Sequence, residues 1–385
     1  MALTGRPDRL PLGPPGPLVE RLRAFGAGLG VDPLQLLGER AAIAGLVRGG
    51  DISCGGATRF VRAKDGWLAV TLARDDDIAA VPAWLETAGD DDDHWRAIAA
   101  VAAERPTELL VAKATLLGLP VAVLPSEPGR VRGVPPFDSL PVRATAFGPS
   151  ARRRTDPPVV VDLSSLWAGP LCGHLLQLGG ARVIKVESTD RPDGARRGPT
   201  DFFDLLNGGK QSVAVALSTP EGLGALRRLI GASDVVIEAS RPRALEQLGI
   251  FASRELLAEP GPAVWISITG YGRDGAAAGR VAFGDDAAVA GGLVVCDTDG
   301  PCFCADAIAD PMSGIVAASA ARLALQSGHR WLLDVAMAGV AADVAGPMLD
   351  AGAIAATAAP PSARQPGKPA APIGRDTRAV LGAIA

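Results

Sequence analysis

The alternation of short β-branched runs with helix-like segments between residues 158 and 270 most constrains the fold of this chain. Two such runs are PVVVDL (158–163) and RVIKVE (182–187), and the segment between them, GPLCGHLLQLGG (169–180), is typical of a helix closed by glycines. Strands connected through helices pair in parallel, with the helices on both faces of the sheet. We therefore expect an α/β fold with a doubly wound, mostly parallel, Rossmann-like sheet.

The same alternation continues along the chain. QSVAVAL (211–217), DVVIEA (234–239) and AVWISITG (263–270) are three further expected strands. Thr219 is expected to cap the helix after the first of them, with Pro220 in the first turn, because a proline there lacks an N–H that would be unsatisfied anyway. In such sheets function lies at the carboxyl ends of the strands.

Residues 52–125 have a different pattern and are expected to form a smaller α+β module. The segment 57–73 is typical of a hairpin, with Asp65 and Gly66 supplying the turn. Helices are expected in 77–86 and 94–119, and a last strand in 120–125.

Tracts rich in proline, glycine and arginine divide the chain. They occupy residues 125–141, 148–158 and 359–372, and the last precedes an expected short terminal helix. The predicted division is 1–50 for an N-terminal helical segment, 51–125 for a small α+β domain, 126–157 for a linker, 158–350 for a large domain, and 351–385 for a linker and C-terminal helix.

Charge and hydropathy exclude some functions. A net charge of −4 and a pI near 5.5 leave no basic field for nucleic acid, and the acidic runs 75–77 and 90–93 are expected to be solvated loops. The start of the chain lacks the apolar stretch of a signal peptide, and no uninterrupted apolar run reaches the roughly 20 residues of a membrane span. We expect a cytoplasmic protein that binds neither nucleic acid nor membrane.

Metal and common nucleotide sites are also not expected. The 5 cysteines form no CxxC pair, and none of the 3 histidines lies at ligand spacing from another. The chain has no GxGxxG and no GxxxxGK[ST], which disfavours an NAD site or a P-loop. No metal or redox cofactor is therefore predicted.

The segment IADPMSG (308–314) contains one carboxylate, Asp310, before a proline and a run of small apolar residues. An aspartate followed by Pro311 is a common helix start, which favours a capping role for Asp310. The same position would keep a reactive carboxylate ionised at the positive end of a helix dipole. The local pattern leaves both interpretations open.

Six segments occur in an order and spacing that is similar to a known enzyme family. They are DLSSLWAGPLCGHLLQLGGARVIKVE (162–187), NGGKQSVAVALSTPEG (207–222), DVVIEASRPRALEQLG (234–249), ISITGYGRDG (266–275), IADPMSG (308–314) and GHRWLLDVAMAG (328–339). Together they resemble family III CoA-transferases, which include formyl-CoA transferase, carnitine and bile-acid CoA-transferases and α-methylacyl-CoA racemase. The resemblance implies the family III CoA-transferase fold. In that family the small domain follows the large sheet, whereas its counterpart here comes first, so the chain looks circularly permuted or re-fused.

The resemblance assigns a chemical role to Asp310. It maps the acyl-accepting aspartate of the family onto this residue, which would carry an aspartyl-CoA thioester between the donor and the acceptor acid. Asp306 is a rival candidate, but it lacks the proline and the apolar helix behind it. CoA would be a substrate, and no cofactor would be bound permanently.

The resemblance also implies a coenzyme A site. Its residues are Trp167, Lys185, Ser240, Arg241, Ala244, Gln247 and Leu248. Ser188 and Gln247 stand where the family often has basic residues. The phosphate charge could instead be met by Lys210, Arg196, Arg197, Arg241 or Arg243.

Several possible active-site residues have an ordinary structural alternative. Trp167 could narrow an acyl pocket or simply pack the turn after the first strand, and Gly55 and Gly56 could cover the site or form the turn before a strand. Asp285 stands where the racemase branch has a histidine, and with Asp286 it could equally begin a capped helix. An aspartate replaces a neutral imidazole at pH 7 only after a large pKa shift, which makes racemization the lesser prediction.

The sequence thus predicts a CoA-transferase that moves CoA between an acyl-CoA and a carboxylic acid through Asp310. An acyl-CoA racemase or epimerase, and a catalytically degenerate homologue that binds acyl-CoA, are the alternatives. The resemblance implies a homodimer. The donor and acceptor acids are not disclosed by the sequence.

Overall fold

A computed structural model describes residues 2–13, 16–87, 93–126, 133–150, 156–240, 242–345 and 358–384. Its main feature is a seven-stranded sheet in the order β4-β12-β9-β8-β5-β6-β7, in which β4 is antiparallel and the other pairs are parallel. The strands are β4 (Arg143–Pro149), β5 (Val159–Asp162), β6 (Arg182–Ser188), β7 (Gln211–Val215), β8 (Val235–Glu238), β9 (Val264–Thr269) and β12 (His329–Ala336). This confirms the predicted α/β fold with a doubly wound, mostly parallel sheet.

The chain order reverses between β5 and β8. From β5 the chain moves outward to β6 and β7, and then returns to β8, β9 and β12 on the other side of β5. In doubly wound sheets this switch point opens a crevice outside the carboxyl ends of the two central strands. The loops after β5 and β8 are therefore the expected place for a ligand.

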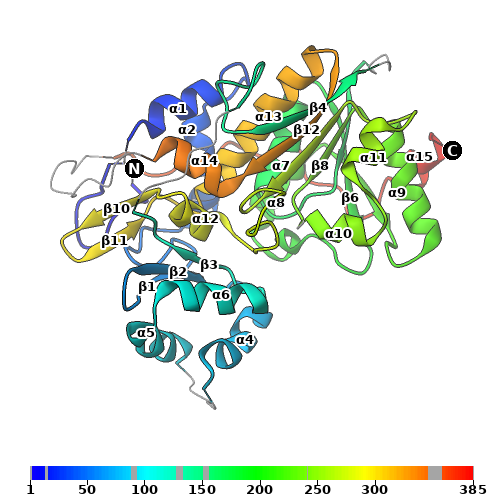
Figure 1. Cartoon of the computed structure of the whole chain (residues 1–385). Helices are drawn as coiled ribbons and strands as arrows, with labels where there is room; N and C mark the ends of the chain where they lie inside the picture. Colours follow the sequence, from blue (N-terminus) through cyan, green and yellow to red (C-terminus); the bar gives the residue numbers. More distant parts are fainter. Residues whose placement is uncertain are drawn as a thin grey trace.

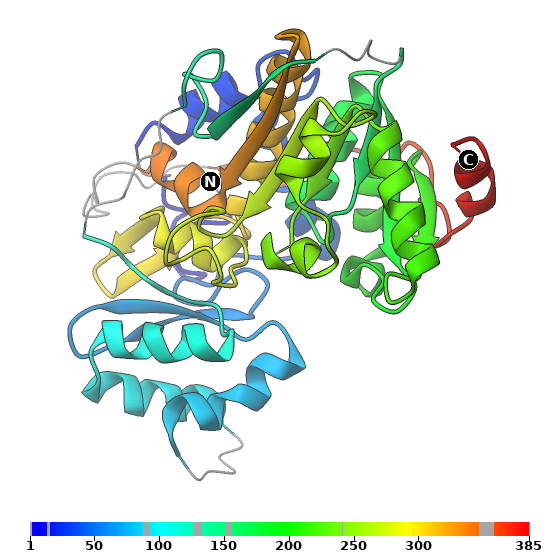
Figure 2. The same ribbon diagram turned by 45° about the vertical axis from the view of Figure 1, so that its right-hand side comes forward.

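Helices cover both faces of the sheet, as Figures 1 and 2 show. On one face α7 and α13 pack on the central strands, and on the other face α9 and α11 do so. Thr219 accepts a hydrogen bond from the backbone N–H of Gly222 at 3.1 Å, which confirms the predicted cap of α9. The helices of this part are α7 (Ala168–Leu178), η1 (Gly194–Arg197), α8 (Thr200–Asn207), α9 (Pro220–Ala232), α10 (Pro242–Gln247), α11 (Ala252–Leu257) and α13 (Ala309–Gln326).

The small unit lies against the edge where the parallel strands end (Figure 1). It consists of an antiparallel sheet, β1 (Thr58–Arg62), β2 (Trp67–Thr71) and β3 (Val121–Val123), and of α4 (Asp75–Leu85), α5 (His94–Glu104) and α6 (Thr107–Leu117). The predicted hairpin is confirmed, since Arg62 pairs with Trp67 across the loop. Val61, Leu68 and Val70 face the three helices, because neighbouring strand residues point to opposite faces.

The other face of the small sheet contacts the large unit. Phe60 stacks on Phe303 with ring centroids 4.3 Å apart, and Ala69, Val289 and Val294 complete this apolar contact. Three elements of the large unit build this contact region: α12 (Gly284–Ala290) and the hairpin of β10 (Val294–Asp297) and β11 (Gly300–Phe303). Helix α14 (Met337–Val344) packs on α12 and α13.

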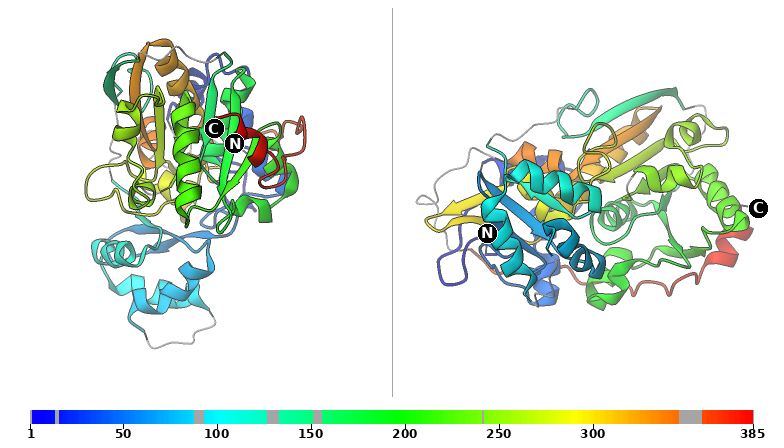
Figure 3. Two further views of the ribbon diagram at one scale, coloured as in Figure 1. Left: turned by 90° about the vertical axis from the view of Figure 1, so that its right-hand side faces the viewer. Right: turned by 60° about the horizontal axis from the view of Figure 1, so that its bottom comes forward.

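Both chain ends pack on the large unit (Figure 3). The N-terminal helices are α1 (Leu18–Phe25), α2 (Pro33–Leu36) and α3 (Glu39–Ala44), and Leu18, Leu22 and Leu36 belong to the core around α7 and α13. The predicted C-terminal helix is α15 (Thr377–Gly382), which lies beside β7. Asp376 accepts a hydrogen bond from the Ser212 N–H at 2.8 Å and so attaches the tail to that edge.

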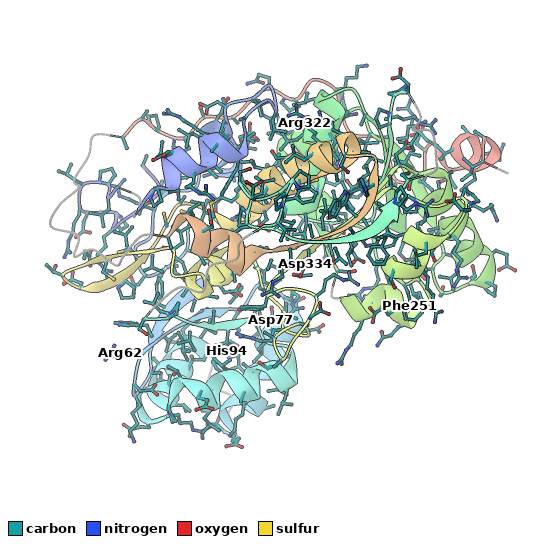
Figure 4. All side chains as sticks on the ribbon, turned by 45° about the horizontal axis from the view of Figure 1, so that its top comes forward. Arg62, Asp77, His94, Phe251, Arg322 and Asp334 are labelled. Carbon is teal, nitrogen blue, oxygen red and sulfur yellow. The ribbon has the colours of Figure 1, made fainter. Side chains whose placement is uncertain are left out.

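Two expectations differ from the structure. Residues 75–77 are not a solvated loop but the first turn of α4, and Asp77, labelled in Figure 4, is 2% exposed. Its carboxylate accepts the N–H of Arg74 at 2.9 Å and that of Ala73 at 3.2 Å, and acidic residues favour the positive end of a helix dipole. Within the expected linker 126–157, β4 adds an edge strand to the large sheet, and Phe137 and Val142 are buried in the core.

Candidate active site

Asp310 lies at the start of α13, but it is not the N-cap. The helix begins at Ala309, so Asp310 is its second residue and does not have the capping role that was one of the two interpretations of the local pattern. The residue is half-buried and its carboxylate lies against Gly284 of α12, where a Cβ added to that glycine would come within 2.5 Å of Oδ2. Gly284 leaves the space in which the carboxylate sits.

The environment of Asp310 raises its pKa to about 7. Burial is the main cause, and repulsion from Asp285 and Asp306 adds to it, whereas the positive charge of Arg40 and a hydrogen bond from the Gly284 backbone lower it. A carboxylate with a pKa near 7 is partly ionised at neutral pH and more basic than an ordinary aspartate. It is therefore a stronger nucleophile once it is ionised.

Helix α12 carries two more buried carboxylates, Asp285 and Asp286, and Asp285 is the one that repels Asp310. Asp285 accepts a hydrogen bond from the Ala307 N–H at 2.9 Å and one from the Thr58 hydroxyl at 3.4 Å. Burial and the repulsion of Asp306 raise the pKa of Asp285 to about 6. Both oxygens of Asp285 are thus engaged with protein groups.

Asp286 points toward the small unit. Its Oδ1 accepts hydrogen bonds from the Phe283 N–H at 2.8 Å and the Thr71 hydroxyl at 3.1 Å, and its buried Oδ2 has no partner among the residues that the structure describes. Burial raises the pKa of Asp286 to about 7. The hydrogen bond to Phe283 agrees with the predicted capped helix start, since Asp286 is the third residue of α12.

Arg40 brings a guanidinium to these carboxylates from the N-terminal segment. Its Nε donates to Asp306 Oδ2 at 2.8 Å and its Nη2 donates to Oδ1 of the same residue, a bidentate pair in which Asp306 is fully buried. The Cζ of Arg40 lies 5.3 Å from the centre of the Trp167 ring. Asp306, the rival nucleophile, is therefore committed to an ion pair.

The backbone around Asp306 is strained. Ala305 has φ of 58° and Ala307 has φ of 41°, both in the left-handed region that residues with a side chain seldom adopt. Such strain costs on the order of 1–3 kcal/mol per residue and persists only where the surroundings hold it. Here the Thr4 hydroxyl accepts the Ala305 N–H at 3.0 Å and Asp285 accepts the Ala307 N–H.

Trp167 occupies the loop after β5, at the switch point. Its ring is 4% exposed and packs edge-on against Phe202 with ring centroids 5.1 Å apart. Its Nε1 is buried and finds no hydrogen-bond partner within the described part of the chain. Core packing of Trp167 is thus present, and its contact with an acyl group stays a prediction.

Gly55 and Gly56 form the turn before β1, as one of the two sequence interpretations has it. The Gly56 N–H donates to Ser53 O at 2.8 Å, and Gly56 has φ of +78°. A Cβ on Gly55 would lie 3.3 Å from Nη2 of Arg40. Asp285, Asp306 and Asp310 together form what we call the carboxylate cluster. The turn of Gly55 and Gly56 in the small unit therefore borders this cluster.

The predicted coenzyme residues lie at two places. Lys185 is buried, with its Nζ donating to Asp193 Oδ2 at 2.8 Å and to Ser164 O at 3.0 Å. Asp193 also accepts the N–H of Leu166 at 3.0 Å, so this ion pair fixes the loop that carries Trp167. Lys185 has a structural role here, and its contact with CoA stays a prediction.

The other predicted coenzyme residues follow β8. Ala244 and Gln247 are exposed on α10, Ser240 and Leu248 are half-buried at its two ends, and Arg241 lies outside the described residues. This position, at the carboxyl end of β8, agrees with a ligand at the switch point.

Two of the basic residues proposed for phosphate are occupied by ion pairs. Lys210 donates to Asp162 Oδ2 at 2.9 Å, and Arg196 forms a bidentate pair with Glu187. Arg197 and Arg243 are exposed. Ser188, at a position that is often basic in the family, is half-buried.

The sequence pattern missed Arg40, Thr58 and Thr71. Arg40 pairs with a residue 266 positions away, and Thr58 and Thr71 contact α12 across 227 and 215 positions. Local sequence patterns cannot predict contacts between residues that are so far apart in the chain.

Across the described ranges, no group of three or more His, Cys, Asp or Glu side chains is placed to hold a metal ion. In the same ranges no helix combines the length and the apolar character that crossing a membrane requires.

Fold and site together define a doubly wound α/β protein with a carboxylate cluster at the carboxyl edge of its sheet. The sequence profile of CoA-transferase family III matches residues 158–375, more than half of the chain. The chain belongs to CoA-transferase family III, which confirms the family that the six segments resemble.

Curated relatives match only part of the chain. The succinyl-CoA–D-citramalate CoA-transferase of Chloroflexus aurantiacus is 34% identical over 141 residues, 35% of each protein. The succinate–glutarate CoA-transferase of Agrobacterium fabrum is 31% identical over 198 residues, 46% of this chain and 49% of the relative. Human α-methylacyl-CoA racemase is 37% identical over 119 residues, 30% of this chain and 28% of the relative. The chain thus spans about half of these relatives or less.

Among solved structures, a CAIB/BAIF family protein from Brucella suis is similar with a TM-score of 0.45 and 30% identity, over 49% of this chain and 54% of that chain.

Proposed function

We propose that this protein transfers CoA from an acyl-CoA to a carboxylic acid, with Asp310 as the residue that is acylated. The observation that carries the proposal is the half-buried carboxylate of Asp310 at the start of α13, in the space left by Gly284 and attracted by the positive charge of Arg40. Membership in CoA-transferase family III and the relatives named as CoA-transferases support it.

In the proposed reaction an oxygen of Asp310 attacks the thioester carbonyl, the C–S bond breaks, and a mixed anhydride and CoA thiolate result. The thiolate then attacks the aspartyl carbonyl, which releases the donor acid as a carboxylate and leaves an aspartyl-CoA thioester. The acceptor carboxylate attacks this thioester and displaces the CoA thiolate, which gives a second mixed anhydride. The thiolate then attacks the acyl carbonyl of the acceptor, which gives the new acyl-CoA and releases Asp310 as a carboxylate. Exclusion of water matters, because each intermediate can hydrolyse.

The surroundings of Asp310 support this assignment. The backbone N–H of Gly284 faces the carboxylate, and a fixed donor at this position suits the oxyanions that form during acyl transfer. The turn of Gly55 and Gly56 and the Trp167 ring border the same place, and we assign them to the acyl side of the site. We assign CoA itself to the crevice between the loops after β5 and β8, with Ser240, Ala244, Gln247 and Leu248 along α10.

Intact-protein mass spectrometry tests the proposal. The protein is incubated with a panel of acyl-CoA esters, succinyl-CoA among them, and the expected result is an adduct of acyl or CoA mass that hydroxylamine removes. Asp310→Asn should abolish it. Asp201→Asn is the matched control, because Asp201 is also in the first turn of a helix but is exposed on α8. A folded protein that binds CoA and never forms an adduct would support the degenerate homologue.

Proton exchange at the α-carbon of an acyl-CoA is a second candidate. The pKa values of about 6 for Asp285 and about 7 for Asp310 would let two carboxyl groups trade protons near neutral pH. The full engagement of Asp285 with Ala307 and Thr58 argues against it. Exchange of the α-hydrogen in deuterated water, without CoA transfer, would favour the racemase or epimerase over the transferase.

The proposal includes a homodimer in the cytoplasm, as the family resemblance implies. Light scattering coupled to size-exclusion chromatography tests the dimer, with twice the chain mass of 39.2 kDa as the expected result. A monomer that forms the adduct would overturn the dimer and leave the chemistry intact. Fractionation of cells tests the location.

A further inference from the structure

Arg40 joins the N-terminal segment to the carboxylate cluster. The residue belongs to α3, outside the family match at 158–375, yet its guanidinium contacts Asp306 and stacks on Trp167. The Gly55 turn lies on its other side. Three regions of the chain that are distant in sequence therefore meet at this one side chain.

The charges at the cluster are unbalanced without Arg40. Asp285, Asp306 and Asp310 all attract its guanidinium, and the hydrogen bonds to Asp306 raise the pKa of Arg40 against the lowering effect of burial. Arg40 thus stays charged throughout the physiological range. Asp306 is fully buried, so the loss of its partner would leave a buried charge uncompensated.

Arg40 acts on Asp310 in two ways. It attracts the negative charge of Asp310, and it fixes Asp306 within the strained loop that leads into α13. The position of Asp310 depends on that loop, because only three residues separate it from Asp306. Arg40 therefore influences both the charge state and the position of Asp310.

We propose that Arg40 is the positioning residue that favours the ionised form of Asp310 and, through Asp306, holds Asp310 in place, so that the N-terminal segment forms part of the active site. The expected effect of Arg40 on the rate of adduct formation rests on the proposed function. The expected effect of Arg40 on the titration of Asp310 does not. Arg40 touches neither substrate nor reacting atoms in this assignment, and it acts through Asp306 and through its charge.

Other titratable groups near Asp310 and Arg40 could also affect the titration of Asp310. Asp285 comes from α12, Asp306 from the loop before α13, and both repel Asp310. Cys54, in the turn before β1, lies near Asp285, Asp306 and Arg40, and burial raises the pKa of its thiol, so it stays neutral near pH 7. Asp286 repels Asp285 in turn.

The direct test is an NMR titration of aspartate ¹³Cγ resonances, in which the Asp310 signal is the one that Asp310→Asn removes. Arg40→Gln should raise the titration midpoint of Asp310 by about one pH unit or more, because an adjacent cation favours a carboxylate by about that much. Arg40→Lys keeps the charge and should leave the midpoint near that of the wild type. An unchanged midpoint in Arg40→Gln would overturn the inference.

Arg21→Gln is the matched control, since Arg21 is in the same N-terminal segment and donates to Asp343 at 2.8 Å, on α14. It should not move the midpoint of Asp310. If Arg40→Gln does not fold, the double variant Arg40→Gln/Asp306→Asn leaves no unpaired charge and is compared with Asp306→Asn. These two variants differ only at Arg40, so the double variant should show the higher midpoint, and equal midpoints would overturn the inference.

The kinetic test follows adduct formation with succinyl-CoA as a function of pH. Below the midpoint the rate should be about tenfold lower in Arg40→Gln, as follows from a shift of one pH unit, and should recover at high pH. A purely structural defect would lower the rate equally at every pH, which would refute the electrostatic role. If the wild type forms no adduct with any ester of the panel, the proposed function fails, and the NMR titration still decides the inference.

Discussion

At the scale of single residues, three aspartates within or next to α12 and α13 have raised pKa values for the same reason. Burial disfavours the charged form of Asp285, Asp286 and Asp310, and repulsion by a neighbouring carboxylate adds to it in each case. Their surroundings differ: Asp310 is half-buried and attracted by the guanidinium of Arg40, whereas Asp286 is fully buried and one of its oxygens has no partner among the described residues. Only Asp310 combines partial exposure with a cation, which suits a nucleophile.

Asp286 gives a prediction about stability. Its folded pKa of about 7 lies above the ordinary value of 3.8, so the native state binds more protons than the unfolded state between these pH values. Stability therefore falls as pH rises through this window, and Asp286→Asn removes that loss. We expect the variant to be more stable than the wild type by about 4 kcal/mol at pH 8, because each unit of pKa shift is worth about 1.4 kcal/mol, and nearly equal to it at pH 4.

Urea unfolding at the two pH values measures this difference. The exposed Asp201→Asn serves as the control, with the same pH dependence as the wild type. A wild type and an Asp286→Asn variant that lose stability in parallel between pH 4 and pH 8 would show that Asp286 does not titrate in this window.

At the scale of elements, the contact between α7 and α13 positions the site. Gly314 faces α7 so closely that a Cβ would lie 2.7 Å from the Ala168 carbonyl oxygen and 3.1 Å from the Leu171 side chain. The helix with Asp310 thus packs directly on the helix that follows Trp167. This close contact between α7 and α13 therefore fixes the position of Asp310 relative to Trp167.

Gly314→Ala should separate the two helices. We expect a loss of about 1–3 kcal/mol in stability and a lower rate of adduct formation, because overpacking displaces the start of α13. Gly224→Ala is the control, since this glycine is also within a helix but its Cβ would meet only Arg228 Nη1, at 3.7 Å. Helix propensity predicts that Gly224→Ala gains up to about 1 kcal/mol. Thermal unfolding and adduct mass spectrometry measure both variants, and a fully active, stable Gly314→Ala would contradict the prediction.

The elements also show what a sequence can predict. Strands β5 to β9 of the large sheet, the turn at Asp65 and Gly66 and the Thr219 cap follow from local patterns, because each depends on neighbouring residues. β4 was missed, since its segment lies among prolines and arginines and gains its partner β12 from far along the chain. The Arg40–Asp306 pair has no local signal at all, because 266 positions separate its members.

At the scale of the whole molecule, the small unit meets the large one through contacts that also border the site. Thr58 and Thr71 donate to the aspartates of α12, and the stacked pair of Phe60 and Phe303 seals the apolar part of the contact. The family match covers the large unit and not the small one. Association of the two units therefore depends on these contacts, whatever the order of the domains along the chain.

Phe303→Ala tests this association. Phe303 is 4% exposed, and the loss of a buried phenylalanine costs about 3–5 kcal/mol. We expect the small unit to unfold before the large one, so that calorimetry shows two transitions, and we expect the adduct rate to fall because the Gly55 turn loses its place. Phe251→Ala is the control, since Phe251, labelled in Figure 4, is half-buried beneath Arg254 far from this contact and should cost less than about 1.5 kcal/mol. A single transition at the wild-type temperature, with full activity, would show that other contacts suffice to hold the two units together.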